Sequence, residues 1–138
     1  MDQLRTCRRL CIESHKGQFR RGGDDYFKHP LRMSQLFEEE GLINEACVAA
    51  LHDTFEDTML TGVECLDAGV DKVIVDAVAC LTRTAGEDYD DYINHIAKCS
   101  DLVLRVKIAD ILDNVSDSPT EKQMKKYRKA LLTIMKGN

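Results

Sequence analysis

Long apolar runs are missing from this sequence. None of its stretches approaches the roughly 18 apolar residues that a membrane-spanning helix needs. The amino-terminal residues, MDQLRTCRRLC, also lack the apolar region of a secretion signal. We therefore expect a cytoplasmic protein that does not partner with a membrane.

An excess of positive charge is absent as well. The chain contains 19 lysines and arginines against 24 aspartates and glutamates, which gives a net charge of −5. This balance argues against a general attraction of the whole molecule to nucleic acid. Any anionic ligand must be held by a local group of basic side chains.

The sequence has no internal repeat, low-complexity tract or linker. Hydrophobic residues make up 43% of its 138 positions, and a chain of this length can bury a core without disulfides or structural metals. We therefore expect one domain that covers residues 1–138.

The six cysteines are scattered and include no C-x-x-C pair. In a cytoplasmic protein they are expected to be reduced core residues. Cys7, Cys11 and His15 recur every four residues and would share one helical face, which raises the alternative of a zinc site. No fourth ligand is near them in the sequence, so we favour packing.

Strand-like alternation is scarce, whereas apolar residues recur at helical spacing through most of the chain. This pattern predicts an all-α orthogonal bundle of about seven or eight helices. The segment 18–27 contains paired glycines and paired aspartates and is predicted to be a loop. The expected helices cover residues 4–16, 30–41, 44–55, 61–66, 70–81, 89–96, 102–112 and 119–134.

Two of these helices carry start signals. Thr61 and Glu64 have the spacing of a capping box. For the last helix, Ser118 is the predicted cap, with Pro119 and Glu121 inside the first turn. The lysine-rich face of that helix is interpreted as solvated.

Chemistry-bearing residues gather in the segment LHDTFEDT, residues 51–58. His52, Asp53, Glu56 and Asp57 would lie on one face at the end of an apolar helix. Burying four ionisable groups is costly unless something pairs with them. A divalent metal ion would do so.

A second candidate is Asp110, which lies among apolar residues in the segment VKIADILDN. A metal shared with His52 and Asp53 would pair with this carboxylate, and His29 could supply a fourth ligand. Two imidazoles and two carboxylates suit manganese, iron, zinc or another borderline divalent ion.

The ordered segments HKGQFRRGGDDYFKHP, LHDTFEDT and VKIADILDN resemble those of the HD-domain metal-dependent phosphohydrolases. The resemblance is more specific to the hydrolase domain of the Rel/Spo alarmone enzymes and their small stand-alone relatives, and it covers nearly the whole chain. It implies the HD-domain fold.

The resemblance also implies a role for individual residues. His29, His52, Asp53 and Asp110 would bind the metal, usually manganese, while Glu56 and Asp57 would activate or orient the attacking water. Arg20 and Arg21 would lie against the purine and its phosphates, and Asn114 would contact the nucleotide. The implied reaction removes the 3′-pyrophosphate from guanosine tetra- or pentaphosphate, so the expected partner is a small nucleotide.

Two alternatives stay open: hydrolysis of another nucleotide phosphate, such as a ribose 2′- or 3′-phosphate, and a non-catalytic nucleotide-binding module. The chain has Gly23, Asp24, Asp25 and Tyr26 where the family usually has Gly-Glu-Pro-Tyr, so its substrate preference could differ. The synthetase and regulatory parts of the large Rel/Spo proteins do not fit in 138 residues, so we expect no alarmone synthesis.

The remaining histidines and two tyrosines are assigned structural roles. We expect His15 to hold the arginine-containing loop by a hydrogen bond, and His95, Tyr89 and Tyr92 to pack. The sequence is compatible with a homo-oligomer.

Overall fold

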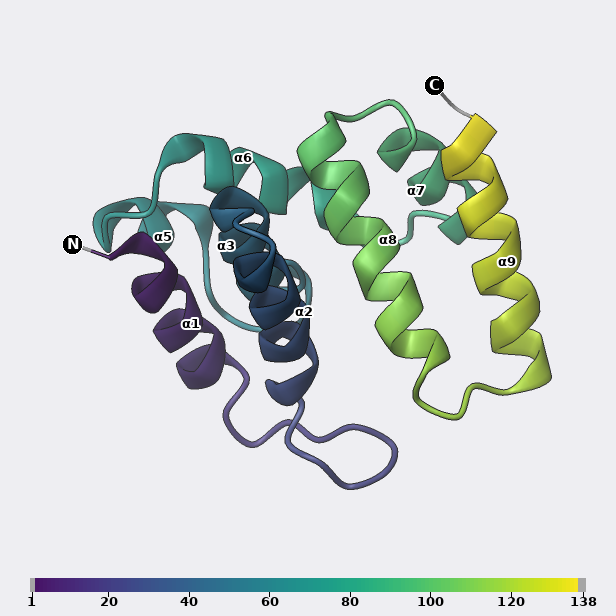
Figure 1. The fold of residues 1–138 in the computed structure, drawn as a ribbon, viewed down its shortest axis with the longest axis horizontal. Coiled ribbons are helices and arrows are strands. Elements are labelled where there is room, and N and C mark those ends of the chain that lie inside the picture. Colours follow the sequence, from purple (N-terminus) through teal and green to yellow (C-terminus); the bar gives the residue numbers. More distant parts are fainter. Residues whose placement is uncertain (1, 137–138) are drawn as a thin grey trace.

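The computed structural model describes residues 2–136, which form nine helices and no strand. Figure 1 shows α8 running through the middle of the bundle, with α1, α2, α3, α5 and α6 on one side and α7 and α9 on the other. None of these helices is long and apolar enough to cross a membrane. The helices are α1 (Gln3–Ser14), α2 (Lys28–Glu39), α3 (Ile43–Leu51), α4 (Thr54–Asp57), α5 (Gly62–Asp67), α6 (Lys72–Leu81), α7 (Tyr89–Ile96), α8 (Asp101–Val115) and α9 (Glu121–Lys136).

Helix α3 is the centre of the core. Residues 45–51 of this helix are all buried, and α1, α2, α6 and α8 pack around it. Helix α8 contacts α2, α3 and α6 with one face and α7 and α9 with another, so it joins the two sides of the bundle (Figure 1). The predicted all-α bundle is confirmed.

The predicted helix over residues 44–55 is wrong in one respect, because the helix is interrupted at His52 and Asp53. His52 Nδ1 donates to the carbonyl of Ala49, and the Thr54 hydroxyl donates to the carbonyl of Leu51. In a continuous helix these carbonyls would bond the backbone N–H groups four residues ahead. Side chains thus replace backbone donors, and α4 becomes a separate single turn.

The capping box at the start of α5 is confirmed, with Thr61 and Glu64 in reciprocal bonds. The predicted cap of the last helix is wrong. Thr120 accepts from the backbone of Gln123, whose side chain accepts from the backbone of Thr120, and Ser118 lies in the preceding connection with φ of 48°. The reciprocal Thr120–Gln123 pair therefore sets the start of α9 two residues later than predicted.

The six cysteines are free, and four of them are buried in the core. The zinc alternative at Cys7, Cys11 and His15 does not form, because both ring nitrogens of His15 bond other partners, Gln18 and Asp53. The loop 18–27 is confirmed and is closed by one isolated bridge between Phe19 and Asp25.

Two adjacent residues of α6 provide a test of this packing. Ile74 is fully buried, whereas Val73, the preceding residue of the same helix, is 53% exposed. Replacing Ile74 by alanine should lower the free energy of unfolding by roughly 2–5 kcal/mol, because it leaves a cavity in the core. Val73→Ala should change it by less than about 0.5 kcal/mol. Urea denaturation of both variants measures the two changes in the free energy of unfolding. Equal decreases for both variants would contradict this packing.

Candidate active site

A cavity opens where the α3–α4 junction faces α8. Its lining comes from distant segments of the chain, because α3, α6, α7 and α9 all pack against α8. The lining residues are Tyr26, His52, Asp53, Glu56, Asp57, Leu81, Arg83, Tyr89, Tyr92, Lys107, Asp110, Ile111, Asn114, Lys126 and Tyr127.

The interruption between α3 and α4 positions His52 and Asp53 at this cavity. Because His52 Nδ1 donates to the Ala49 carbonyl at 2.7 Å, its proton is fixed on that nitrogen. The other ring nitrogen, Nε2, then lies 3.3 Å from Asp110 Oδ1 and 3.6 Å from Asp53 Oδ2. His52 therefore presents the nitrogen that a metal ion would use.

His29, in the first turn of α2, is oriented in the same way. Its Nδ1 donates to Asp113, and its Nε2 lies 2.9 Å from Asp110 Oδ1. Arg32 in turn donates two hydrogen bonds to Asp113. Metal-binding histidines commonly have their second nitrogen held by a carboxylate or a carbonyl, as both are here.

The donor atoms of His29, His52 and Asp53 lie within 4.8 Å of one another, and the distances above bring Asp110 to the same point. Burial alone would lower the pKa of His52, but the carboxylates of Asp53 and Asp110 outweigh it and raise that pKa to about 9. The cluster thus attracts positive charge strongly. Two imidazoles and two carboxylates fit a divalent cation.

Asp53 is held by two further side chains. His15 Nε2 donates to Oδ1, and the Tyr26 hydroxyl donates to Oδ2. Burial alone would raise the pKa of Asp53, but His52 and these hydrogen bonds keep it well below its usual range. His15 also bonds Gln18, which confirms that it holds the arginine-containing loop, and it positions Asp53 in addition.

Glu56 and Asp57 lie in α4 at the rim of the cavity, in the first turn of this short helix and not at the end of the predicted long one. The backbone N–H of Arg83 donates to Glu56 Oε1 at 2.7 Å, which fixes that carboxylate. Burial and the carboxylates of Asp53 and Glu56 raise the pKa of Asp57. Both side chains are exposed to solvent, so a proton taken up here can leave.

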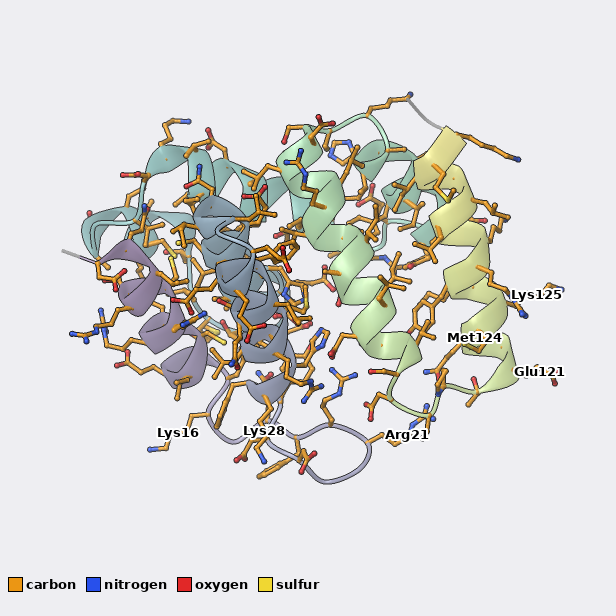
Figure 2. All side chains as sticks on the ribbon, in the orientation of Figure 1. Lys16, Arg21, Lys28, Glu121, Met124 and Lys125 are labelled. Carbon is orange, nitrogen blue, oxygen red and sulfur yellow. The ribbon has the colours of Figure 1, made fainter. Side chains whose placement is uncertain are left out.

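The arginine-containing loop reaches the far end of α8. Arg20 Nη2 donates to Asn114 Oδ1 at 3.0 Å, Arg20 Nε donates to Asp117, and Asn114 Nδ2 donates to Asp110. Arg20 and Asn114 are therefore brought together beside the cluster. Arg21 is exposed and extends from the loop towards the α8–α9 connection, as Figure 2 shows.

A second cavity adjoins the first at this loop. It shares Tyr26, Asn114 and Tyr127 with the first cavity and adds a flat hydrophobic ring, two guanidinium groups and two polar side chains. The residues that line only this second cavity are Phe19, Arg20, Arg21, Asp117 and Gln123.

Several residues at the cavities were missed by sequence reasoning. Asp113 lies three positions from Asp110 on α8, so helical spacing could have indicated it. Lys107 is almost fully buried and donates to Asp110 Oδ2 at 2.9 Å. Tyr92 and Tyr89 pack as expected: the Tyr92 hydroxyl donates to the Leu81 carbonyl, and Tyr89 is half-buried against the core. Both also line the cavity.

Comparisons with known proteins point to one group of enzymes. The chain is 37% identical to a probable GTP pyrophosphokinase of Mycobacterium leprae over an alignment of 134 positions, which covers 88% of this chain and 17% of the relative. It is 35% identical to the bifunctional (p)ppGpp synthase/hydrolase RelA of Mycobacterium tuberculosis over 95% of this chain and 19% of the relative. The guanosine-3′,5′-bis(diphosphate) 3′-pyrophosphohydrolase of Aquifex aeolicus is 30% identical over 83% of this chain and 17% of its own length.

The chain thus spans less than a fifth of the length of these relatives. No protein-family model matches it. A solved structure of a metazoan ortholog of SpoT that hydrolyses ppGpp has the same fold, with a TM-score of 0.82 and 21% sequence identity. The similarity covers 99% of this chain and 85% of the other, and it confirms the predicted fold.

The Asp113–His29 contact can be tested through metal affinity. Asp113→Asn keeps the shape of the side chain but removes the charge that orients His29. We expect the affinity for Mn²⁺ to fall roughly 10–100-fold. Isothermal titration measures it, with Asp101→Asn, an exposed position at the start of the same helix, as the control. An unchanged affinity would show that Asp113 does not orient a ligand.

Proposed function

Because the chain resembles the hydrolase domain of the Rel/Spo alarmone enzymes in sequence and has the HD-domain fold, we propose that it removes the 3′-pyrophosphate from guanosine tetra- or pentaphosphate. The observation that carries this proposal is the group His29, His52, Asp53 and Asp110, with both imidazoles turning Nε2 towards Asp110. Glu56 and Asp57 lie at the rim of the same cavity.

We assign these four residues as the ligands of one divalent ion, with Mn²⁺ preferred and Fe²⁺ or Zn²⁺ as alternatives. When bound, such an ion neutralises phosphate charge and makes water more acidic. The fit rests on the donor set and on the fixed imidazole tautomers, since His29 and His52 each have Nδ1 held by a partner.

Hydrolysis then requires one bond to form, one bond to break and a proton to be transferred. The oxygen of water bonds to the phosphorus next to the ribose, and the bond from that phosphorus to O3′ breaks. Glu56 or Asp57 takes the proton that water loses, O3′ takes up a proton, and pyrophosphate leaves. The raised pKa of Asp57 supports this role, because a carboxylate with a higher pKa is a better proton acceptor.

The adjoining cavity suits the nucleoside. The guanidinium groups of Arg20 and Arg21 can stack on a base or bind phosphate. Asn114 and Tyr127 line both cavities, so they would contact the ribose between the base and the reacting phosphate. We therefore assign Arg20, Arg21 and Asn114 to nucleotide binding.

The altered loop favours a second candidate, hydrolysis of another nucleotide with a ribose phosphate. Relative to the family's Gly-Glu-Pro-Tyr, the added negative charge is that of Asp25, and the neighbouring Asp24 carboxylate is exposed and lies 3.8 Å from Lys28. The cytoplasmic location, a partner restricted to small nucleotides and the oligomeric state stay predictions.

Manganese-dependent hydrolysis is the direct test. Purified protein incubated with guanosine tetraphosphate and Mn²⁺ should yield GDP and pyrophosphate, which anion-exchange chromatography resolves. A chelator should abolish the conversion. Asp53→Ala should abolish both the conversion and metal binding, because it removes a ligand and leaves His15 and Tyr26 without their partner.

A thermal melt of the Asp53→Ala variant must show a folded protein for this comparison to count. If the variant still binds one equivalent of Mn²⁺, the ligand assignment is wrong. If folded, metal-loaded wild type converts no guanosine tetraphosphate but hydrolyses ribose 2′- or 3′-phosphates, the second candidate replaces the first. Binding without any hydrolysis would indicate a nucleotide-binding module.

Glu56→Gln separates proton transfer from structure. Glutamine keeps an oxygen that can accept from the Arg83 N–H but cannot take a proton from water. We expect Mn²⁺ affinity to stay unchanged and kcat to fall roughly 100-fold or more. Glu39→Gln, at an exposed position of α2, is the control. A near-normal kcat for Glu56→Gln would limit Glu56 to a structural role.

A further inference from the structure

The first cavity contains three cationic side chains that the reaction above does not use: Arg83, Lys107 and Lys126. Lys107 is paired with Asp110 at 2.9 Å. Neither Arg83 nor Lys126 forms an ion pair with a carboxylate anywhere in residues 2–136, and Arg83 Nε donates only to the backbone carbonyl of Glu87. Both cationic groups are therefore available to pair with an anionic ligand.

The ring of Tyr89 holds these two cations together. Lys126 Nζ lies 4.0 Å from the ring centroid, and the Arg83 guanidinium carbon lies 5.7 Å from the same centroid. Both distances are in the range of cation–π contacts. Burial and the proximity of Arg83 and Lys107 lower the pKa of Lys126, so the cations are close enough to repel one another. A bound anion would relieve that repulsion.

The division of residues between these two cavities indicates which anion this is. Arg20 and Arg21 line the second cavity but not the first, Asn114 and Tyr127 line both, and Arg83 and Lys126 line the first but not the second. The four proposed metal ligands meet at the first cavity. If the nucleoside occupies the second cavity and its reacting phosphorus lies at these ligands, Lys126 and Arg83 are left for a further phosphoryl group of the same substrate.

We propose that Lys126 and Arg83, supported by Tyr89, bind the distal phosphoryl group of the leaving pyrophosphate and so select a diphosphate ester over a monophosphate ester. This inference rests on the proposed function. It assigns a role in substrate specificity to side chains outside the three segments that carry the family resemblance. A monophosphate would leave the two cations without a partner, whereas a diphosphate is long enough to meet them. Lys107 stays with Asp110.

The test compares Lys126→Gln with Lys125→Gln. Both lysines lie on α9, but Lys125 extends away from the bundle, as Figure 2 shows, and does not line the cavity. Isothermal titration with inorganic pyrophosphate and with inorganic phosphate, at fixed ionic strength and equal Mn²⁺ on both sides, needs no turnover. Wild type should bind pyrophosphate more tightly than phosphate, and Lys126→Gln should weaken pyrophosphate binding roughly tenfold through loss of a charged hydrogen bond.

Lys125→Gln should match wild type, and Lys126→Arg should restore the preference because it keeps the charge. Pyrophosphate binding that Lys126→Gln leaves unchanged, or that Lys125→Gln weakens equally, would overturn the proposal.

Hydrolysis assays on the same variants separate this proposal from the previous one. Lys126→Gln should lower kcat/KM for guanosine tetraphosphate but not for a guanosine carrying a 3′-monophosphate. If guanosine tetraphosphate is hydrolysed equally well by Lys126→Gln and wild type, the subsite is refuted while the hydrolase stands. If Lys126 is needed for pyrophosphate binding but no nucleotide is hydrolysed, the subsite is supported and the hydrolase is refuted.

Discussion

The buried carboxylate of Asp110 is the constraint on which the rest of the structure depends. A charged group in the middle of a helix bundle is costly unless donors surround it. Asp110 meets His29 from α2, His52 from the end of α3, and Lys107 and Asn114 from its own helix. Because these partners come from three helices, α8 must lie across α2 and α3 with this face inward. The fold and the site are therefore set by the same contacts.

The interruption of α3 costs backbone hydrogen bonds and changes the orientation of His52 and Asp53. Ending the helix at Leu51 gives up backbone hydrogen bonds, which the His52 ring and the Thr54 hydroxyl replace. In exchange, His52 is fixed in one tautomer and Asp53 is released from helical geometry so that it can meet His15 and Tyr26. A continuous helix would place the two side chains about 100° apart around its axis, whereas here Asp53 has a non-helical φ of −122°.

Much of this could be predicted from the sequence, for reasons that are local. The spacing of apolar residues predicts the helices. The carboxylates and imidazoles among these apolar residues indicate His29, His52, Asp53 and Asp110 as candidate metal ligands from the sequence alone. The interruption at His52 could not be predicted in this way, because apolar spacing continues through it. The predicted start of α9 was wrong because Ser118 and Thr120 are both hydroxyl residues that can cap a helix, and the structure uses Thr120. Tyr89 and Lys126 were not identified as site residues, since only the packing of α7 and α9 beside α8 brings them to the cavity. Lys107 lies on α8 itself, three positions before Asp110, so helical spacing could have indicated it.

The cavity carries charges of both signs. Asp53, Glu56, Asp57 and Asp110 supply its carboxylates, and Arg83, Lys107 and Lys126 supply its cations. A chain with a net charge of −5 would repel a polyanionic nucleotide at long range, and that repulsion is screened beyond about 8 Å at physiological salt. Recognition must then come from groups that touch the ligand. A divalent ion among the carboxylates would offset two of their four negative charges, so that the cavity should attract phosphate more strongly when the metal is bound. Binding of a phosphorylated nucleotide and binding of the metal are therefore expected to be coupled: each should raise the affinity for the other by the same factor.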